Sequence, residues 1–145
     1  PEITGKLQEQ EESLFACQEL LWKMQYKEAG ADRRIVQFIK EEKVENALWE
    51  FLLEHCPVTD NEYYLRMAEV LLEAEEPDKA EIVLKRSLKA APGDEMVLCL
   101  LADLAIKSGD IETALLHLSQ IENPGDLSMK FQKMCMQLKE RKQHG

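Results

Sequence analysis

The chain has 145 residues, the size of one compact domain, so we expect residues 1–145 to form a single domain. Apolar residues make up 45% of the chain and charged residues 32%, with few glycines, prolines and aromatics, a composition typical of a helical globular protein. The formal net charge of -10 repels a phosphate backbone, which argues against nucleic acid and an anionic membrane as partners.

The cysteines Cys17, Cys56, Cys99 and Cys135 show no paired spacing, which predicts free thiols in a reducing compartment. We therefore expect an intracellular protein, cytoplasmic or nuclear. No apolar stretch approaches the ~18 residues of a transmembrane helix, and the first residues do not resemble a signal segment. Because the sequence starts without Met, we expect it to be part of a larger protein.

The first predicted element is one amphipathic helix over about 6–28. Its apolar residues recur at three- and four-residue steps, as on one face of an α-helix: Leu7, Leu14, Phe15, Cys17, Leu20, Leu21, Met24 and Tyr26. Three interpretations stay open for this helix. It caps a neighbouring helix pair, or it uses the face that carries Trp22 and Tyr26 to pack on a second chain or to fold back onto the concave surface of the repeats.

A helix pair with weak repeat character is predicted over 32–60. At an offset of 33 residues, apolar residues of this segment align with those of the next one: Ile35 with Ala68, Phe38 with Leu71, Ala47 with Ala80 and Phe51 with Leu84. The alignment predicts a degenerate first copy of the unit that follows.

Two similar units occupy 61–94 and 95–126. An offset of 34 residues pairs Met67 with Leu101, Ala68 with Ala102, Leu71 with Ala105, Ala80 with Ala114 and Leu84 with Leu118. Pro77, Asp94 and the pair Gly109-Asp110 supply helix starts and turns. We therefore predict helices at 61–74, 78–90, 95–108 and 110–122.

The last predicted element is a helix over 127–142, whose apolar residues Leu127, Phe131, Met134, Cys135 and Leu138 recur at helical steps. We expect it to cap the exposed end of the preceding pair, since repeats need a polar outer cap. The alternative is a homo-oligomerisation domain that uses the terminal helices, including the face with Met129, Met134 and Met136.

The two units resemble tetratricopeptide repeats, which are helix pairs of ~34 residues with small side chains where the two helices cross. Ala68, Ala80, Ala102 and Ala114 occupy those crossing positions, and Tyr64 and Pro92 match further positions of the motif. The resemblance implies an all-α fold, an α-solenoid of antiparallel helix pairs with about eight helices and capping helices at both ends. It also implies a non-enzymatic protein-interaction module, an adaptor or scaffold.

The resemblance further implies a partner-binding groove lined by the first helix of each pair. Carried over position by position, the groove residues are Glu62, Leu65, Arg66, Glu69, Leu72 and Glu73, then Met96, Cys99, Leu100, Asp103, Ile106 and Lys107. Such a groove is apolar with an acidic rim, and it suits a helix or peptide with an apolar anchor and basic flanks. The alternative is that neighbouring helices cover these apolar positions.

Two ligands known for similar helical repeats do not suit these residues. Some tetratricopeptide repeats hold the C-terminal carboxylate of Hsp70 or Hsp90 with Lys and Asn, whereas this chain has Leu65, Glu69, Cys99 and Asp103 at those places. The acids repel a carboxylate, so we do not expect an Hsp70 or Hsp90 tail as the ligand. The related pentatricopeptide repeats read RNA with a basic surface, which these acids do not provide.

We find no residue set that predicts catalysis. His55 and Cys56 are sequence neighbours and therefore point about 100° apart on a helix. The sequence has no Cys-x-x-Cys spacing, and His117 does not suggest a zinc site. Glycines are too scattered for a phosphate-binding loop. We therefore predict no enzyme activity, no cofactor and no metal, and a regulatory or catalytic helical domain remains the alternative.

Overall fold

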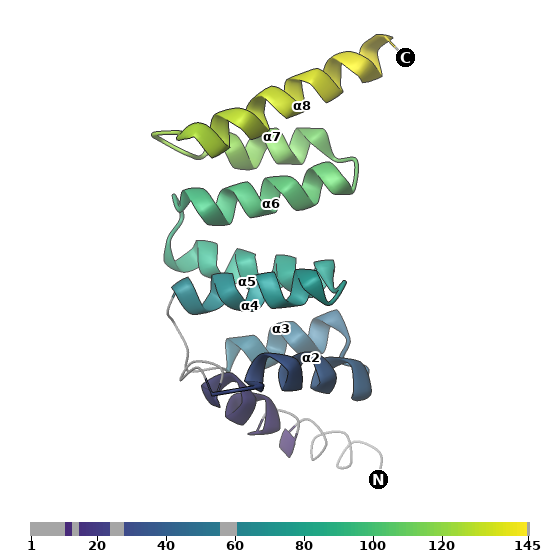
Figure 1. Cartoon of the computed structure of the whole chain (residues 1–145), viewed down its shortest axis with the longest axis vertical. Coiled ribbons are helices and arrows are strands. Elements are labelled where there is room, and N and C mark those ends of the chain that lie inside the picture. The colour runs from purple at the N-terminus through teal and green to yellow at the C-terminus, as the bar shows by residue number, and fades with distance from the viewer. Residues whose placement is uncertain (1–10, 13–14, 24–27, 56–60, 145) are drawn as a thin grey trace. The chain divides into compact units, whose positions relative to one another are not determined.

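The computed structural model describes residues 11–12, 15–23, 28–55 and 61–144, which form helices and connecting turns and include no strand (Figure 1). By its packing the chain divides into two compact units, residues 1–83 and residues 84–145, with the boundary inside helix α5.

Helices α2 to α4 and the start of α5 belong to the first unit, and the rest of α5 with α6 to α8 belongs to the second. The bounds are α2 (Ala31–Glu41), α3 (Asn46–Glu54), α4 (Asn61–Glu73), α5 (Pro77–Ala90), α6 (Glu95–Lys107), α7 (Ile111–Ser119) and α8 (Asp126–His144). The described residues 15–23 are also helical. The predicted all-α fold of helix pairs is confirmed, and from residue 61 onward each predicted helix lies within a few residues of an observed one. Parts of the predicted helix over 6–28 lie outside the described residues.

Three helix pairs close with the same turn. In each, one residue adopts a left-handed backbone: Lys43 with φ 49°, Glu75 with φ 61° and Gly109 with φ 84°. The amide of the next residue then donates to the carbonyl five residues back: Val44 to Ile39 at 3.0 Å, Glu76 to Leu71 at 2.9 Å and Asp110 to Ala105 at 2.8 Å. This pattern satisfies carbonyls that the end of the first helix leaves without an intrahelical partner. The repeat is therefore visible in the backbone as well as in the side chains.

The first pair, α2 and α3, uses a different register from the one predicted. Ala47 is exposed and Phe51 is 39% exposed, so the alignment of these two residues with Ala80 and Leu84 is wrong. The left-handed residue is followed by two residues before α3 begins, but by only one before α5. The buried residues Trp49, Leu52 and Leu53 of α3 consequently correspond to Ala80, Val83 and Leu84, an offset of 31.

The described N-terminal helical segment packs inside the first unit. Cys17 and Leu21 are fully buried, and the hydroxyl of Tyr63 on α4 donates to the Leu21 carbonyl at 2.9 Å. The amide of Gln18 donates to the carbonyl of His55, at the end of α3, at 2.7 Å. These contacts fasten residues 15–23 to both α3 and α4.

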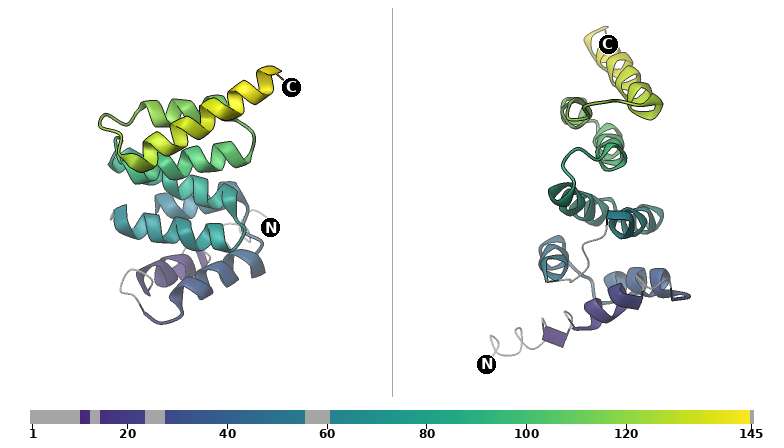
Figure 2. Two further views of the ribbon diagram at one scale, coloured as in Figure 1. Left: turned by 45° about the horizontal axis from the view of Figure 1, so that its top comes forward. Right: turned by 90° about the vertical axis from the view of Figure 1, so that its left-hand side faces the viewer.

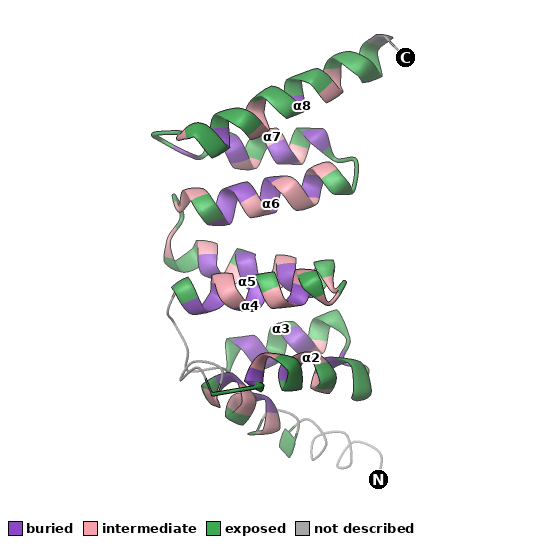
Figure 3. Cartoon of the chain, viewed as in Figure 1, coloured by how far each residue is buried: buried purple, intermediate pink, exposed green. Residues whose placement is uncertain are grey.

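The second unit has a core shared by α6, α7 and α8. Helices α6 and α7, drawn in green, run antiparallel, and α8, in yellow, lies against them (Figure 2). Ala102 and Ala114 are fully buried where α6 meets α7, which allows close backbone approach. Buried positions recur along both helices (Figure 3), and Cys135 adds α8 to the same core.

Aspartates fix the starts of α6 and α7. The Asp94 carboxylate accepts from the Val97 amide at 3.0 Å, and the Asp110 carboxylate accepts from the Thr113 amide at 3.1 Å. These bonds satisfy amides that lack intrahelical partners, as expected of N-capping residues. Helix α7 ends earlier than predicted, because the amides of Gln120 and Ile121 bond to carbonyls three residues back in a tight turn.

Candidate protein-interaction faces

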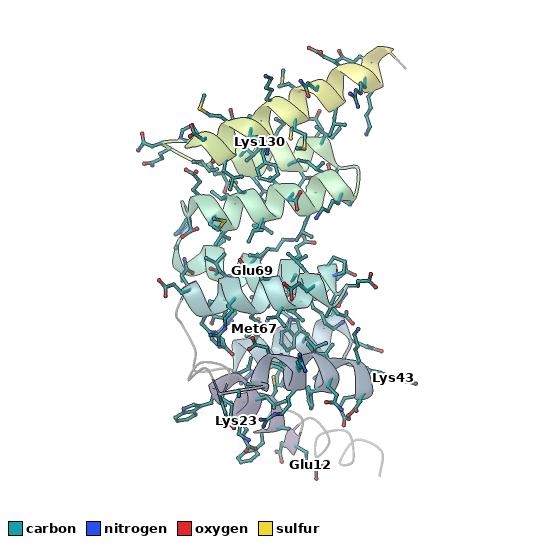
Figure 4. The ribbon with its side chains drawn as sticks, in the orientation of Figure 1. Glu12, Lys23, Lys43, Met67, Glu69 and Lys130 are labelled. Carbon is teal, nitrogen blue, oxygen red and sulfur yellow. The ribbon has the colours of Figure 1, made fainter. Side chains whose placement is uncertain are left out.

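Five residues of helix α4 are buried in the core, and the predicted binding residues of this helix lie outside that core. Its buried side chains are Tyr63, Tyr64, Met67, Ala68 and Leu71. The six predicted groove residues of α4 are either exposed or half-buried: Glu62, Glu69 and Glu73 are exposed, and Leu65, Arg66 and Leu72 are half-buried. Figure 4 labels Glu69 of this face and the core residue Met67. We call these six residues the α4 face.

The half-buried Leu65 and Leu72 share one stripe of the α4 face with Glu69, since positions four and three residues apart are neighbours on a helix. Two apolar side chains thus accompany an exposed carboxylate. The stripe therefore presents apolar atoms beside a negative charge.

Arg66 connects the α4 face to a surface depression of the first unit. Its guanidinium carbon lies 6.0 Å from the centroid of the Tyr63 ring, a cation–π geometry. The depression has a volume of about 360 Å³ and is lined by Glu28, Ala29, Gly30, Asp32, Arg33 and Arg66. Two acids and two arginines line it, so it does not select ligands of one charge sign.

The equivalent residues of α6 divide between surface and core. Met96 is 46% exposed and Lys107 is exposed, while Leu100, Asp103 and Ile106 are half-buried. The Asp103 carboxylate pairs with Lys107 of the same helix at 3.0 Å. Because the Lys107 side chain is 69% exposed, the pair contributes only ~0–1 kcal/mol, so a competing cation displaces Lys107 readily. We call these five residues the α6 face.

Cys99 does not lie on the α6 face, although the sequence predicted it there. Its side chain is 1% exposed, and its Sγ lies 3.4 Å from the Ser128 hydroxyl of α8. Burial is the main cause that raises the pKa of the Cys99 thiol. Helix α8 covers this side of α6, as the alternative interpretation allowed for apolar positions. Sequence reasoning missed Ser128 because a serine carries no apolar signal for a buried contact.

Of the histidines and cysteines that the sequence considered for catalysis or metal binding, His55 makes a contact within its own helix. The Nδ1 atom of His55 lies 2.9 Å from the Phe51 carbonyl of its own helix. Cys56 lies outside the described residues, and His117 is half-buried on α7. Among the described residues, no group of three or more His, Cys, Asp or Glu side chains is placed to hold a metal ion.

The pairs α4–α5 and α6–α7 share one turn and bury alanines at repeated positions, Ala68, Ala80, Ala102 and Ala114, as is typical of helical-repeat proteins. Residues 61–104 match the family model described as "Tetratricopeptide repeat", so the segment from α4 into α6 is a tetratricopeptide-like repeat. The match confirms the resemblance inferred from Ala68, Ala80 and Ala102, and repeats of this family are typically protein-interaction modules rather than enzymes. No curated protein and no solved structure matches the chain. Within the described residues, no helix is both long and apolar enough to cross a membrane.

Proposed function

We propose that the chain is a non-enzymatic adaptor or scaffold module in which the α4 face and the α6 face are each a binding surface for a partner helix or peptide. The observation that carries the proposal is the α4 face itself, where the exposed Glu62, Glu69 and Glu73 accompany the half-buried Leu65 and Leu72. Burial of apolar side chains supplies affinity, and the carboxylates attract cations during encounter. The partner therefore has an apolar anchor with Lys or Arg on its flanks.

The α6 face supports the same ligand chemistry. Met96 is an exposed, flexible side chain of the kind that adapts to different apolar ligands. The Asp103 carboxylate forms an ion pair with Lys107, which is on the same helix and is exposed. The described cysteines Cys17, Cys99 and Cys135 are buried thiols, which supports a reducing, intracellular location.

Self-association through the N-terminal helix is the second candidate function. Phe15 is 71% exposed and Trp22 is 56% exposed, and their seven-residue spacing puts both on one face of the helix. Large exposed aromatics are typical of contact surfaces. A chain that sediments as a monomer at tens of micromolar contradicts this second candidate.

A displayed random peptide library, selected on the purified chain, tests the main proposal. We expect enriched peptides to combine Leu, Ile or Phe anchors with Lys or Arg. Binding of an enriched peptide should weaken about tenfold when Glu69→Arg and Asp103→Arg are combined, because charge pairs near the surface contribute ~0.2–1 kcal/mol each and reversal adds repulsion.

The matched control combines Glu50→Arg with Glu122→Arg, which changes the net charge equally at exposed sites outside both faces. Its affinity should stay near wild type. Enrichment of acidic peptides, or equal loss in both double variants, contradicts the proposal.

A further inference from the structure

Helix α8 begins in the same way as α6. The side of α8 that corresponds to the α7-facing side of α6 is exposed. The first turn of α8 is closed by the Met129 amide bonded to the Gly125 carbonyl at 3.0 Å, and that of α6 by the Leu98 amide bonded to the Asp94 carbonyl at 3.1 Å. This equivalence aligns Leu98 with Met129, Ala102 with Lys133 and Ala105 with Met136.

The aligned residues differ sharply in burial. Leu98, Ala102 and Ala105 belong to the core that α6 shares with α7. Met129 is 58% exposed, Met136 is 53% exposed and Lys133 is also exposed. Met129, Lys133 and Met136 share one stripe of the helix, since they follow one another at four- and three-residue steps. We call this stripe the α8 face.

We propose that the α8 face binds an amphipathic helix of a partner protein whose apolar stripe is flanked by Asp or Glu. Methionine is flexible and polarisable, which suits it to receiving the apolar side chains of a docking helix. Lys133 lies between the two methionines, where it can pair with a carboxylate of the docked helix. No described acidic side chain forms an ion pair with Lys133.

The charge of α8 is opposite to that of the chain as a whole. The helix carries five basic residues and two acidic ones, whereas the chain has a net charge of -10. Lys139 pairs with Glu112 of α7 at 3.5 Å, and Lys142 donates to the Gly109 carbonyl at 3.2 Å, so these two cations serve the packing of α8. Lys130 and Lys133 are exposed, and Figure 4 labels Lys130 on α8. An acidic partner is attracted to these two cations.

Lys133 also argues against two other occupants of the α8 face. A helix crossing as closely as α7 crosses α6 needs a small residue at the position of Ala102, where α8 has Lys133. A symmetric dimer of two α8 faces would be centred near Lys133, and the two ammonium groups would repel each other. A partner helix with acids at its flanks avoids both conflicts.

Methionine methyl NMR tests the proposal with a defined probe. The probe is a synthetic helix of about 20 residues, about 30 Å long, with Leu on one stripe and Glu beside it. The reference peptide has Lys in place of each Glu. We expect the Glu peptide to shift the methyl signals of Met129 and Met136, while Met134 on the other flank of α8 and the core residue Met67 stay unchanged.

Variants of the α8 face give the second measurement. Met129→Ser with Met136→Ser should weaken the Glu peptide about tenfold or more, as expected when apolar contact residues are truncated. Lys133→Glu should weaken it about two- to fivefold and strengthen the Lys peptide. Met134→Ser is the matched control and should leave the affinity unchanged, and circular dichroism should show wild-type helicity for every variant.

Three results would overturn the proposal: signal changes centred on Met134, equal binding of the Glu and Lys peptides, or methyl shifts that depend only on chain concentration. The last indicates a second copy as the occupant. Because the α4 and α6 faces are proposed to bind basic peptides, failure at α8 and failure at those faces are distinguishable. Met96 reports separately on the α6 face.

Discussion

The helix pairs α2–α3 and α6–α7 are joined by the same kind of turn, but they have different residues at the equivalent buried position of the second helix. Trp49 of α3 stands where α7 has Ala114, and both side chains are fully buried. The Trp49 indole Nε1 donates to the Lys79 carbonyl of α5 at 3.2 Å. Trp49 therefore joins α3 to the following pair, whereas Ala114 only permits close contact with α6. A shared turn does not require a shared crossing residue.

The largest effect is expected from Ala114→Arg compared with Ala47→Arg. Ala114 is fully buried in the core of the second unit, so Arg overpacks that core and buries a charge. We expect a loss of roughly 5 kcal/mol or more in the free energy of unfolding. Ala47 is exposed on α3, so Ala47→Arg should change stability by less than about 0.5 kcal/mol. Urea unfolding of both variants measures the difference, and similar losses would contradict the register of α3.

The fold was predictable where local signals and spacing agreed. Gly109 and Asp110 mark a turn and a helix start by their chemistry, and the alanine pairs repeat at a fixed offset. The register of α3 was not predictable in the same way. The turn residues Lys43 and Glu75 carry no glycine signal, and Ala47 resembles a crossing alanine by coincidence.

The candidate faces were predictable to different degrees. The resemblance to tetratricopeptide repeats assigned Leu65 and Glu69 to the groove and Ala68 to the helix crossing, and in the structure Ala68 is buried while Leu65 is half-buried and Glu69 is exposed. The burial of Cys99 depends instead on which helix lies beside α6, and that is a tertiary contact between residues 29 positions apart. The sequence grouped Met129 and Met136 with Met134 as a possible contact face, and the comparison of α8 with α6 was needed to place Lys133 between Met129 and Met136 on one exposed stripe.

A smaller effect is expected at the left-handed turn positions. Gly109→Ala places a Cβ where no atom lies within 4 Å, so its cost comes from the backbone at φ 84° rather than from a clash. Left-handed geometry costs a residue with a Cβ ~1–2 kcal/mol, and the stiffer unfolded chain offsets ~0.4–1 kcal/mol of that. We expect Gly109→Ala to lose about 0.5–1 kcal/mol, and Lys43→Gly and Glu75→Gly each to gain about as much.

Gly93→Ala is the control for this comparison, because Gly93 also has open space around an added Cβ but lacks a left-handed backbone. It should be neutral or slightly stabilising in the same thermal unfolding measurements. If Gly109→Ala and Gly93→Ala have equal stability, the turn does not depend on left-handed geometry at residue 109.

The smallest effect concerns the pH dependence of the cap on α7. Hydrogen bonds from Thr113 hold the pKa of the Asp110 carboxyl below its ordinary value. A lowered folded-state pKa means that this stabilisation is present above the unfolded pKa of about 3.9 and is lost as the pH falls through the folded-state pKa.

Asp110→Asn keeps an acceptor for the Thr113 amide but does not titrate. The melting temperature of the variant should therefore lie below wild type at pH 7, and the gap should close toward pH 2. The control is Glu122→Gln, which changes the net charge equally at an exposed site, and its melting temperature should not converge with that of the wild type toward pH 2. If the difference in melting temperature between Asp110→Asn and wild type stays constant with pH, the charge of Asp110 does not stabilise α7.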